Sequence, residues 1–391
     1  MPILSQGGCL KNLFVTEEEL IDRFTGQELW LWGFNCDGRL GDNTVINKSS
    51  PVQTVSGGTN WRSASLAYSH SAAIKTDGTL WMWGSGAFGQ LGTNSTINRS
   101  SPVQTVSNLT NWRSVSLGDC HSAAIKSGSA SEIGGTLWLW GSGAFGQLGT
   151  NAVINRSSPV QTVSGGTNWK SVSLGDHHSS AIKTDGTLWM WGRGEDGRLG
   201  NNTIINQSSP VQTVSSGTNW RSASLAYKHS AAIKTDGTLW LWGNGGNGRL
   251  GNNAIINQSS PVQTVSGGTN WRNVSIGDYH SAAIKTDGTL WLWGSGALGQ
   301  LGTNTTINRS SPVQTVSGGT NWRNVSLSYS HSAAIKTDGT LWLWGLGYNG
   351  QLGDNAATNK SSPVQTVSGG TSWRSVSTNT LLSAALCVTE F

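Results

Sequence analysis

Charged residues are scarce in this chain of 391 amino acids. Asp, Glu, Lys and Arg together make up 12% of the sequence, which is about half of their usual share. The formal net charge of +5 is modest for the length, so it gives only weak support to a polyanionic partner. Runs of 18 apolar residues are absent as well, and we therefore expect no membrane span.

Cysteine is also rare, with Cys9, Cys36, Cys120 and Cys387 spread along the chain without paired spacing. We expect free thiols rather than a disulfide framework or a zinc site, and no metal or cofactor is expected elsewhere. The start of the chain, MPILSQGGCL, lacks a basic segment followed by a long apolar stretch. A secretory signal is therefore not expected, and synthesis in the cytoplasm leaves the final location open.

Glycine and tryptophan are abundant, with 53 and 21 residues. Both follow a repeat in which the motif LWLWG, or a close variant, ends at Gly33, Gly84, Gly141, Gly192, Gly243, Gly294 and Gly345. The motif SSPVQTVS follows every copy, and a third tryptophan follows each of these prolines. Three tryptophans in each of seven units account for all 21, so the whole body of the chain is one tandem array.

Each unit contains four short segments that are typical of β-strands. WRSVSLG alternates, with Trp112, Ser114 and Ser116 on one side and the residues between them on the other. HSAAIKT and TLWLWG flank the sequence TDG, and Asp-Gly between such segments is a strong hairpin signal. SPVQTV opens with proline, which suits the first residue of a strand. Four strands in about 50 residues, repeated seven times, predict an all-β, seven-bladed β-propeller.

The chain begins and ends in the middle of a unit. It opens with the LWLWG and SPVQTV segments and closes with WRSVS and LLSAALCVTEF, so one blade should take two strands from each terminus. Such pairing leaves no open sheet edge. We therefore expect a propeller over residues 26–391 and a separate N-terminal arm over residues 1–25.

The repeat resembles that of the regulator of chromosome condensation family. The pattern W-x-x-V-x-x-G-x-x-H-x-x-A, D-G-x-L-W-x-W-G-x-G-x-x-G-Q-L-G and P-x-x-V is present almost whole between Trp112 and Val163. The resemblance covers roughly residues 27 to 391 and independently implies a seven-bladed propeller. Near-identical copies are more similar to bacterial and phage-encoded members than to the diverged eukaryotic ones.

Two repeated features look like chemistry but are better explained as structure. Gly84, Gly86 and Gly89 have the G-x-G-x-x-G spacing of a dinucleotide-binding turn, yet no helix can follow and the spacing recurs in six units. We interpret these glycines as residues of positive φ in a tight loop. A histidine at the start of one strand in six units is interpreted as a structural hydrogen-bonding residue. These are His70, His121, His178, His229, His280 and His331.

The sequence offers little for catalysis or nucleic-acid binding. Each unit has an N-x-S sequon, such as Asn98, which we interpret as a turn residue. The next position is basic in five units, including Lys48 and Arg99, but is Gln207 and Gln258 in the other two. This incomplete basic ring makes nucleic acid an unlikely partner, because phosphate binding needs cations clustered on one face. No coordinated departure from the repeat marks a catalytic site, so we expect a non-enzymatic protein.

Differences between the units are concentrated in two loops, the one before the histidine and the one after LWLWG. In an antiparallel blade with strands in chain order, both loops open on the same face, and we interpret that face as the surface for a protein partner. The candidate contact residues are Tyr68, Phe88, Asp119, Phe145, Asp176, His177, Arg193, Glu195, Asp196, Tyr227, Lys228, Asp278, Tyr279, Tyr329 and Tyr348.

Two further segments depart from the repeat. Ser127–Gly135 lengthens one TDG hairpin, and the family resemblance raises nucleotide exchange on a small GTPase, because a projecting hairpin contacts the GTPase in the family's exchange factor. In the arm, TEEELIDRF begins with a capping box and carries Leu20, Ile21 and Phe24 as an apolar stripe, which predicts a short helix or an anchor. The favoured function is protein binding or structural attachment, with virion or surface-assembly proteins of a phage or bacterium as partners. The alternative is a guanine-nucleotide exchange factor.

Overall fold

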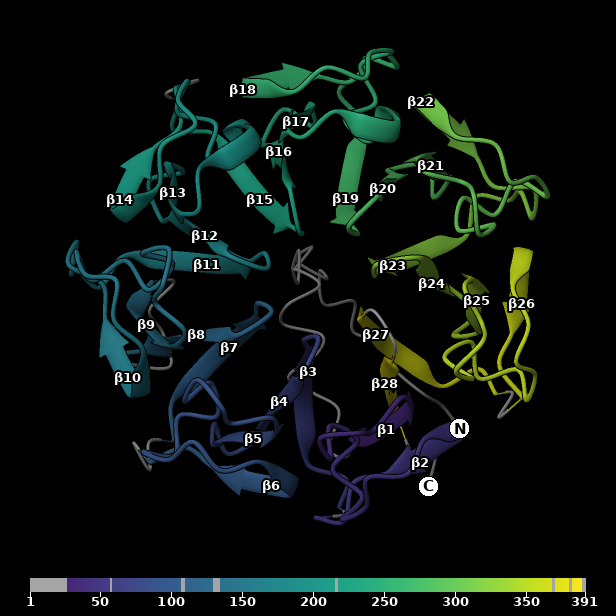
Figure 1. The fold of residues 1–391 in the computed structure, drawn as a ribbon. Coiled ribbons are helices and arrows are strands. Elements are labelled where there is room, and N and C mark those ends of the chain that lie inside the picture. The colour runs from purple at the N-terminus through teal and green to yellow at the C-terminus, as the bar shows by residue number, and fades with distance from the viewer. Residues whose placement is uncertain are drawn as a thin grey trace, which may run out of the picture.

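The computed structural model describes residues 27–56, 58–106, 110–128, 134–214, 217–367, 370–379 and 382–388. Within these ranges the strands form four-stranded antiparallel blades around a central axis (Figure 1). The prediction of a seven-bladed all-β propeller is confirmed, with two single-turn 3-10 segments, η1 (Glu195–Gly197) and η2 (Gly246–Gly248), as the helical part of the described chain.

Each blade runs in chain order from the axis to the rim. The WRSVSL segment is innermost and borders the axis, as the ribbon shows (Figure 1). These innermost strands are β3 (Trp61–Leu66), β7 (Trp112–Leu117), β11 (Trp169–Leu174), β15 (Trp220–Leu225), β19 (Trp271–Ile276), β23 (Trp322–Leu327) and β27 (Trp373–Asn379). The second strands are β4 (His70–Lys75), β8 (His121–Ser127), β12 (His178–Lys183), β16 (His229–Lys234), β20 (His280–Lys285), β24 (His331–Lys336) and β28 (Leu382–Val388).

The third and fourth strands complete each blade toward the rim. The third strands carry LWLWG and are β1 (Gln27–Gly33), β5 (Leu80–Gly84), β9 (Gly135–Gly141), β13 (Leu188–Gly192), β17 (Leu239–Gly243), β21 (Leu290–Gly294) and β25 (Leu341–Gly345). The outer strands are β2 (Lys48–Gln53), β6 (Arg99–Gln104), β10 (Arg156–Gln161), β14 (Gln207–Gln212), β18 (Gln258–Gln263), β22 (Arg309–Gln314) and β26 (Lys360–Gln365).

The two ends of the described chain complete one blade. Its order is β2-β1-β28-β27, and β1 pairs antiparallel with β28 from Gln27 opposite Val388 to Gly33 opposite Leu382. Figure 1 shows the purple β1 beside the yellow β28. Two strands therefore come from each end, as predicted, and the pairing covers an edge that would otherwise be open.

Two local predictions about the strands are wrong. Alternation in the innermost strand is interrupted by a bulge after its tryptophan, so that Trp112 and Leu117 are both buried although they are an odd number of positions apart. Proline does not open the outer strand: Pro102 is the fourth residue of β6, at an irregularity in its pairing with β5. An edge strand tolerates proline there because its outer side needs no ladder hydrogen bond.

The hydrophobic core lies between blades rather than inside them. One cluster combines Ile74, Leu80 and Met82 from β4 and β5 with Trp112 and Trp140 from the next blade. The two indole rings lie 6.3 Å apart, and burying about 150–250 Å² of each contributes roughly 4–6 kcal/mol. Because each core needs two neighbouring blades, the cores depend on the closure of the ring.

Hydrogen bonds, like the hydrophobic cores, connect each blade to its neighbour. The indole N–H of Trp140 and the hydroxyl of Ser122 both donate to the carbonyl of Gln90, each at 2.8 Å. His70 Nε2 lies 2.9 Å from the hydroxyl of Ser122. Since the serine proton is directed to Gln90, the imidazole Nε2–H donates to the serine. The histidines are thus hydrogen-bonded links between blades.

Candidate functional site

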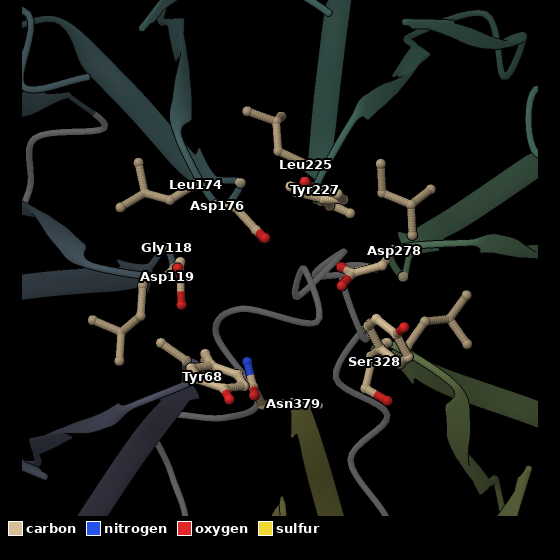
Figure 2. Close-up of a pocket in the computed structure, with 18 of the residues that line it drawn as sticks. Tyr68, Gly118, Asp119, Leu174, Asp176, Leu225, Tyr227, Asp278, Ser328 and Asn379 are labelled. Carbon is tan, nitrogen blue, oxygen red and sulfur yellow. The ribbon is translucent and has the colours of Figure 1, made fainter. Parts of the chain in front are cut away.

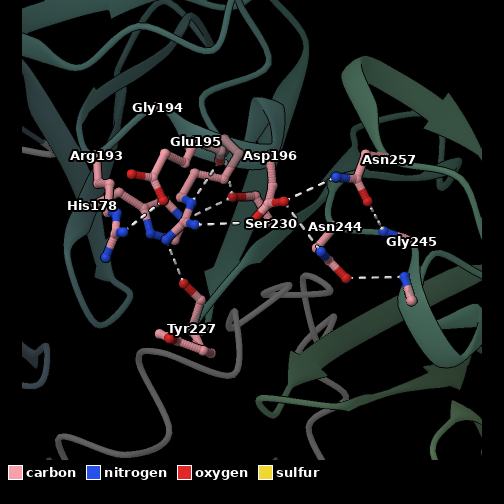
Figure 3. Close-up of polar contacts among 12 residues, drawn as sticks. His178, Arg193, Gly194, Glu195, Asp196, Tyr227, Ser230, Asn244, Gly245 and Asn257 are labelled. Atoms are coloured by element: carbon pink, nitrogen blue, oxygen red, sulfur yellow. Dashed lines mark hydrogen bonds and ion pairs between the residues drawn. The ribbon is translucent and has the colours of Figure 1, made fainter.

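The two variable loops of each blade open on one face and contact each other between blades; we call this face the variable-loop face. The loop after LWLWG contributes a buried arginine in three units, which reaches the neighbouring loop before the histidine (Figure 3). Arg198 Nη1 donates to the carbonyl of Tyr227 at 2.8 Å, Arg249 Nη1 donates to that of Asp278 at 2.7 Å, and Arg39 Nη1 donates to that of Tyr68. These guanidinium groups fix the loops rather than offer charge to a partner.

The predicted aromatic residues form two groups rather than one continuous ring. Tyr68, Tyr227, Tyr279 and Tyr329 line a cavity on the central axis. Phe88, Phe145 and Tyr348 lie farther out, in loops between third and fourth strands. The exposed members are Tyr348 at 66%, Tyr68 at 49%, Phe88 at 43% and Tyr329 at 37%.

Several of these rings are held by contacts within the face. Tyr279 and Tyr329 meet edge-to-face with centroids 4.9 Å apart, and their hydrogen bond raises the pKa of Tyr279 to about 12. Phe145 lies 5.1 Å from His177 and 4.9 Å below the guanidinium of Arg193. Because these rings are already fixed by their neighbours, they lose little side-chain entropy when a partner binds. This property suits them to a docking surface.

The central cavity has a volume of about 560 Å³ and is lined by residues from all seven blades. Leucines such as Leu66 and Leu225 end the innermost strands below it. Figure 2 shows the carboxylates of Asp119, Asp176 and Asp278 pointing inward from three different blades. Three acidic groups and a tyrosine rim therefore share one opening.

Burial and mutual repulsion control the protonation of these carboxylates. The pKa of Asp278 is raised to about 7, mainly by burial and then by the charge of Asp119, while the charge of Arg249 opposes the shift. Burial and the neighbouring carboxylates hold the pKa of Asp176 well above its usual range. The pKa of Asp119 is raised as well, mainly by burial. A cationic group in the cavity would relieve this repulsion.

The outer part of the face carries paired charges. Glu195 binds Arg193 at 2.6 Å, and Asp196 binds the buried Arg198 at 3.1 Å. Asp196 also accepts hydrogen bonds from Asn257 at 2.9 Å, in the next blade (Figure 3). Lys228 lies over the ring of Tyr227 at 4.9 Å. Of these residues, Glu195 is the exposed acid that is open to a partner.

The histidine ring lies directly beneath this face, at the starts of the second strands and inside the blades. All six side chains are fully buried, and burial lowers the pKa to about 3 for His70, His121, His280 and His331. The imidazoles are therefore neutral at physiological pH. Throughout the described part of the chain, no three His, Cys, Asp or Glu side chains gather closely enough to hold a metal ion. No described helix is long and apolar enough to span a membrane.

A ring of cations at the opposite end of the axis was not predicted. The second residue of each innermost strand is basic and half-buried, and five of these residues donate from Nη2 to backbone carbonyls of the next innermost strand. The ring comprises Arg62, Arg113, Lys170, Arg221, Arg272, Arg323 and Arg374. Their recurrence after tryptophan was visible in the sequence, but only the fold shows that they surround one axis.

Two predicted features lie wholly or partly outside the described residues. The arm, with Leu20, Ile21 and Phe24, precedes the described part of the chain. The Ser127–Gly135 hairpin is described only up to residue 128 and from residue 134. Both remain predictions.

Fold and loop arrangement together define a β-propeller whose blades are joined through tryptophan, histidine and arginine contacts. The family model described as the RCC1-like domain matches residues 20–269 and 130–390. The chain belongs to this family, as the repeat predicted.

Curated relatives are diverse. The ultraviolet-B receptor UVR8 of Arabidopsis thaliana is 27% identical over 357 residues, covering 87% of this chain and 77% of the receptor. RUG3, a mitochondrial RCC1 domain-containing protein of the same plant, is 30% identical over 72% of this chain and 64% of RUG3. The human E3 ubiquitin-protein ligase HERC2 is 30% identical over 83% of this chain but only 7% of its own length.

Solved structures with the same fold include human WBSCR16, with a TM-score of 0.80, 19% identity and coverage of 93% of this chain and 100% of that one. Yeast RCC1 (Prp20), solved bound to Kap60, has a TM-score of 0.83, 15% identity and coverage of 100% and 97%. At these identities the similarity establishes the fold alone.

Proposed function

We propose that this chain is a non-enzymatic binding module that takes a protein partner on its variable-loop face. The observation that carries the proposal is the position of the differences between otherwise near-identical blades: apart from the 127–135 hairpin and a few strand positions such as Lys170, they gather on this one face, around a cavity lined by tyrosines and carboxylates. If these loops were needed only for blade assembly, we would expect their sequences to be nearly the same in every unit, as most loops on the opposite face are. Exposed tyrosines supply large contact area at low entropic cost.

The partner that best suits this face carries a basic segment. Asp119, Asp176 and Asp278 point into the cavity, and nearby tyrosine rings can stack on a cation. A lysine or arginine side chain that enters the cavity would supply a positive charge to these carboxylates. Because it would also displace water, the attraction between the opposite charges would become stronger. The surrounding rim, with Tyr68 and Tyr348 exposed, would bury apolar area around it.

Structures of related proteins support a protein-binding role. Prp20 was solved bound to Kap60, and a second Prp20 structure is described together with its binding to Gsp1p and histones. The finer proposal, attachment to a bacterial or phage assembly, rests on the near-identity of the repeats. In that setting the partners would be virion or surface-assembly proteins, with the N-terminal arm as a second contact.

Affinity capture from the native source, followed by mass spectrometry, identifies the partner, and a titration with the purified partner then tests the face. Tyr68→Ser combined with Tyr329→Ser should weaken binding about 100-fold, because two exposed rings at the cavity rim are removed. Val265→Ser changes an apolar residue of similar exposure outside the two variable loops and serves as the control. Unchanged binding by a folded tyrosine variant would rule out this face.

The alternative function is nucleotide exchange, which the family resemblance raises for the 127–135 hairpin. Its test is the rate at which a labelled guanine nucleotide leaves a small GTPase from the same source. We expect no acceleration. Acceleration by the native chain that is lost when residues 127–135 are replaced by the TDG turn of the other blades would favour exchange over attachment.

A further inference from the structure

A hollow at the basic end of the axis lies where the ring of arginine contacts is interrupted. At five other junctions between blades, an arginine reaches across to the next innermost strand. Arg62 Nη2 donates to the carbonyls of Trp112 and Arg113 at 2.6 and 3.1 Å, and Arg221 Nη2 donates to those of Trp271 and Arg272 at 2.9 and 2.8 Å. Each such guanidinium fills the space between two blades.

Lys170 occupies this position in β11, and its ammonium donates no hydrogen bond to any described residue. A lysine lacks the planar fork with which arginine binds two carbonyls at once. The junction between β11 and β15 is consequently open. A hollow of about 220 Å³ lies there, lined by Arg113, Lys170 and Arg221.

The lining of the hollow is rich in hydrogen-bond donors. Serines 171, 173 and 222 contribute to its wall. The same blade carries Ser180 where the corresponding residue of the other histidine-containing strands is alanine, and its hydroxyl donates to the carbonyl of Ser173 at 3.1 Å. The blade therefore departs from the repeat twice at one place, in Lys170 and in Ser180.

The charges of Lys170 and Arg221 are not neutralised by acids of the described chain. Neither Lys170 nor Arg221 forms an ion pair with a described residue. The remaining cations of the ring add a long-range positive potential along the same axis. Meanwhile the hairpins at this end present Asp185 and Asp236, whose pKa values are lowered by hydrogen bonds from Thr187 and Thr238, so both are ionised.

We propose that this hollow binds a small anion that carries phosphate groups. Three cations line the hollow, so their charge suits an anion of about −2 to −3 better than a single carboxylate, and ammonium, guanidinium and hydroxyl groups all donate to phosphate oxygens. An extended polyanion such as nucleic acid fits less well, because it would have to lie across the ionised hairpin aspartates. This site is independent of the variable-loop face.

The test is a calorimetric titration of the intact chain with inorganic pyrophosphate at low salt. We expect one pyrophosphate per chain and an affinity that falls as salt is added. Lys170→Gln should lower the affinity about tenfold by removing a charge. Lys170→Arg keeps the charge but restores the crossing contact seen in the other blades, so it should also lower the affinity about tenfold by filling the hollow.

Arg99→Gln is the matched control, since Arg99 is exposed at the start of an outer strand and its loss changes the net charge equally. It should leave the affinity within about twofold. Because Lys170 makes no hydrogen bond that the fold needs, its variants should melt as the parent does. Retained affinity in Lys170→Arg would show that net charge alone attracts the anion and would overturn the site. Absence of pyrophosphate binding, or tighter binding of a twelve-residue oligothymidylate, would overturn the ligand assignment.

Discussion

At the scale of single residues, the G-x-G-x-x-G motif shows how a ligand signature can be a packing requirement. Gly84 and Gly89 have φ values of +100° and +79°, as predicted from the tight loop. Gly86 does not have a positive φ; a Cβ there would lie 2.5 Å from the carbonyl oxygen of Ile97. Gly84 and Gly89 are thus needed because the backbone has a positive φ there. Gly86 is needed because the backbone of Ile97 lies too close to leave room for a side chain.

Gly89→Ala should destabilise the protein by about 3 kcal/mol. The added Cβ would lie 2.5 Å from Ser157 Cα in the next blade, and the left-handed conformation adds strain of its own. Gly165→Ala is the control: its φ is +51°, but no atom lies within 4 Å of the added Cβ, so about 1 kcal/mol is expected. Urea unfolding measures both changes. Equal losses would show that conformation alone decides the effect.

At the scale of elements, the closing blade is the place where the two ends of the chain depend on each other. β28 pairs along its whole length with β1 and on its other side with β27. Trp32 in β1 also donates its indole N–H to the carbonyl of Gln351 in the preceding blade at 3.0 Å. Loss of these strands would expose two interblade cores at once.

Deleting residues 373–391, which removes β27 and β28, should abolish cooperative unfolding and cause aggregation, because β1 and the neighbouring blades would present open edges. Tryptophan fluorescence during urea unfolding, together with gel filtration, measures the outcome. Deleting only residues 389–391 leaves β28 whole and is the control. A monomeric, cooperatively folding product of the larger deletion would contradict the proposed role of closure.

At the scale of the whole molecule, the buried histidines couple stability to pH. Their pKa values in the folded chain lie far below the ordinary value of about 6.5, because burial disfavours the charged form. Below about pH 6.5 the unfolded chain therefore binds protons that the folded chain does not. The raised pKa values of Asp119, Asp176 and Asp278 act in the opposite direction, but they involve fewer groups.

Stability should therefore fall as the pH is lowered from about 7 to 5, at up to about 1.4 kcal/mol per pH unit for each histidine once the pH is below its unfolded pKa. The urea midpoint measured across this range tests the expectation. His121→Gln, which cannot be protonated, should be less stable at pH 7 but show a shallower slope. A midpoint that rises on acidification would show that the aspartates dominate.

Much of the fold was predictable because the repeat encodes it locally. Seven copies of hairpin signals and strand patterns specify four strands per blade, and the incomplete units at the two ends predict the closing blade. The bulge after Trp112 and the internal position of Pro102 were not predictable, because both follow from how a strand pairs with its neighbour rather than from its own pattern.

Part of the candidate sites was also predictable from the sequence, and part was not. Comparing copies within the sequence was enough to find the variable loops and to expect them on one face, since chain order in an antiparallel blade determines which loops lie together. Only the tertiary structure showed that Asp119, Asp176 and Asp278 point into one cavity and that Lys170 leaves a hollow beside Arg113 and Arg221. Within each set these residues lie about 50 to 160 positions apart, and closure of the ring around one axis is what brings them together.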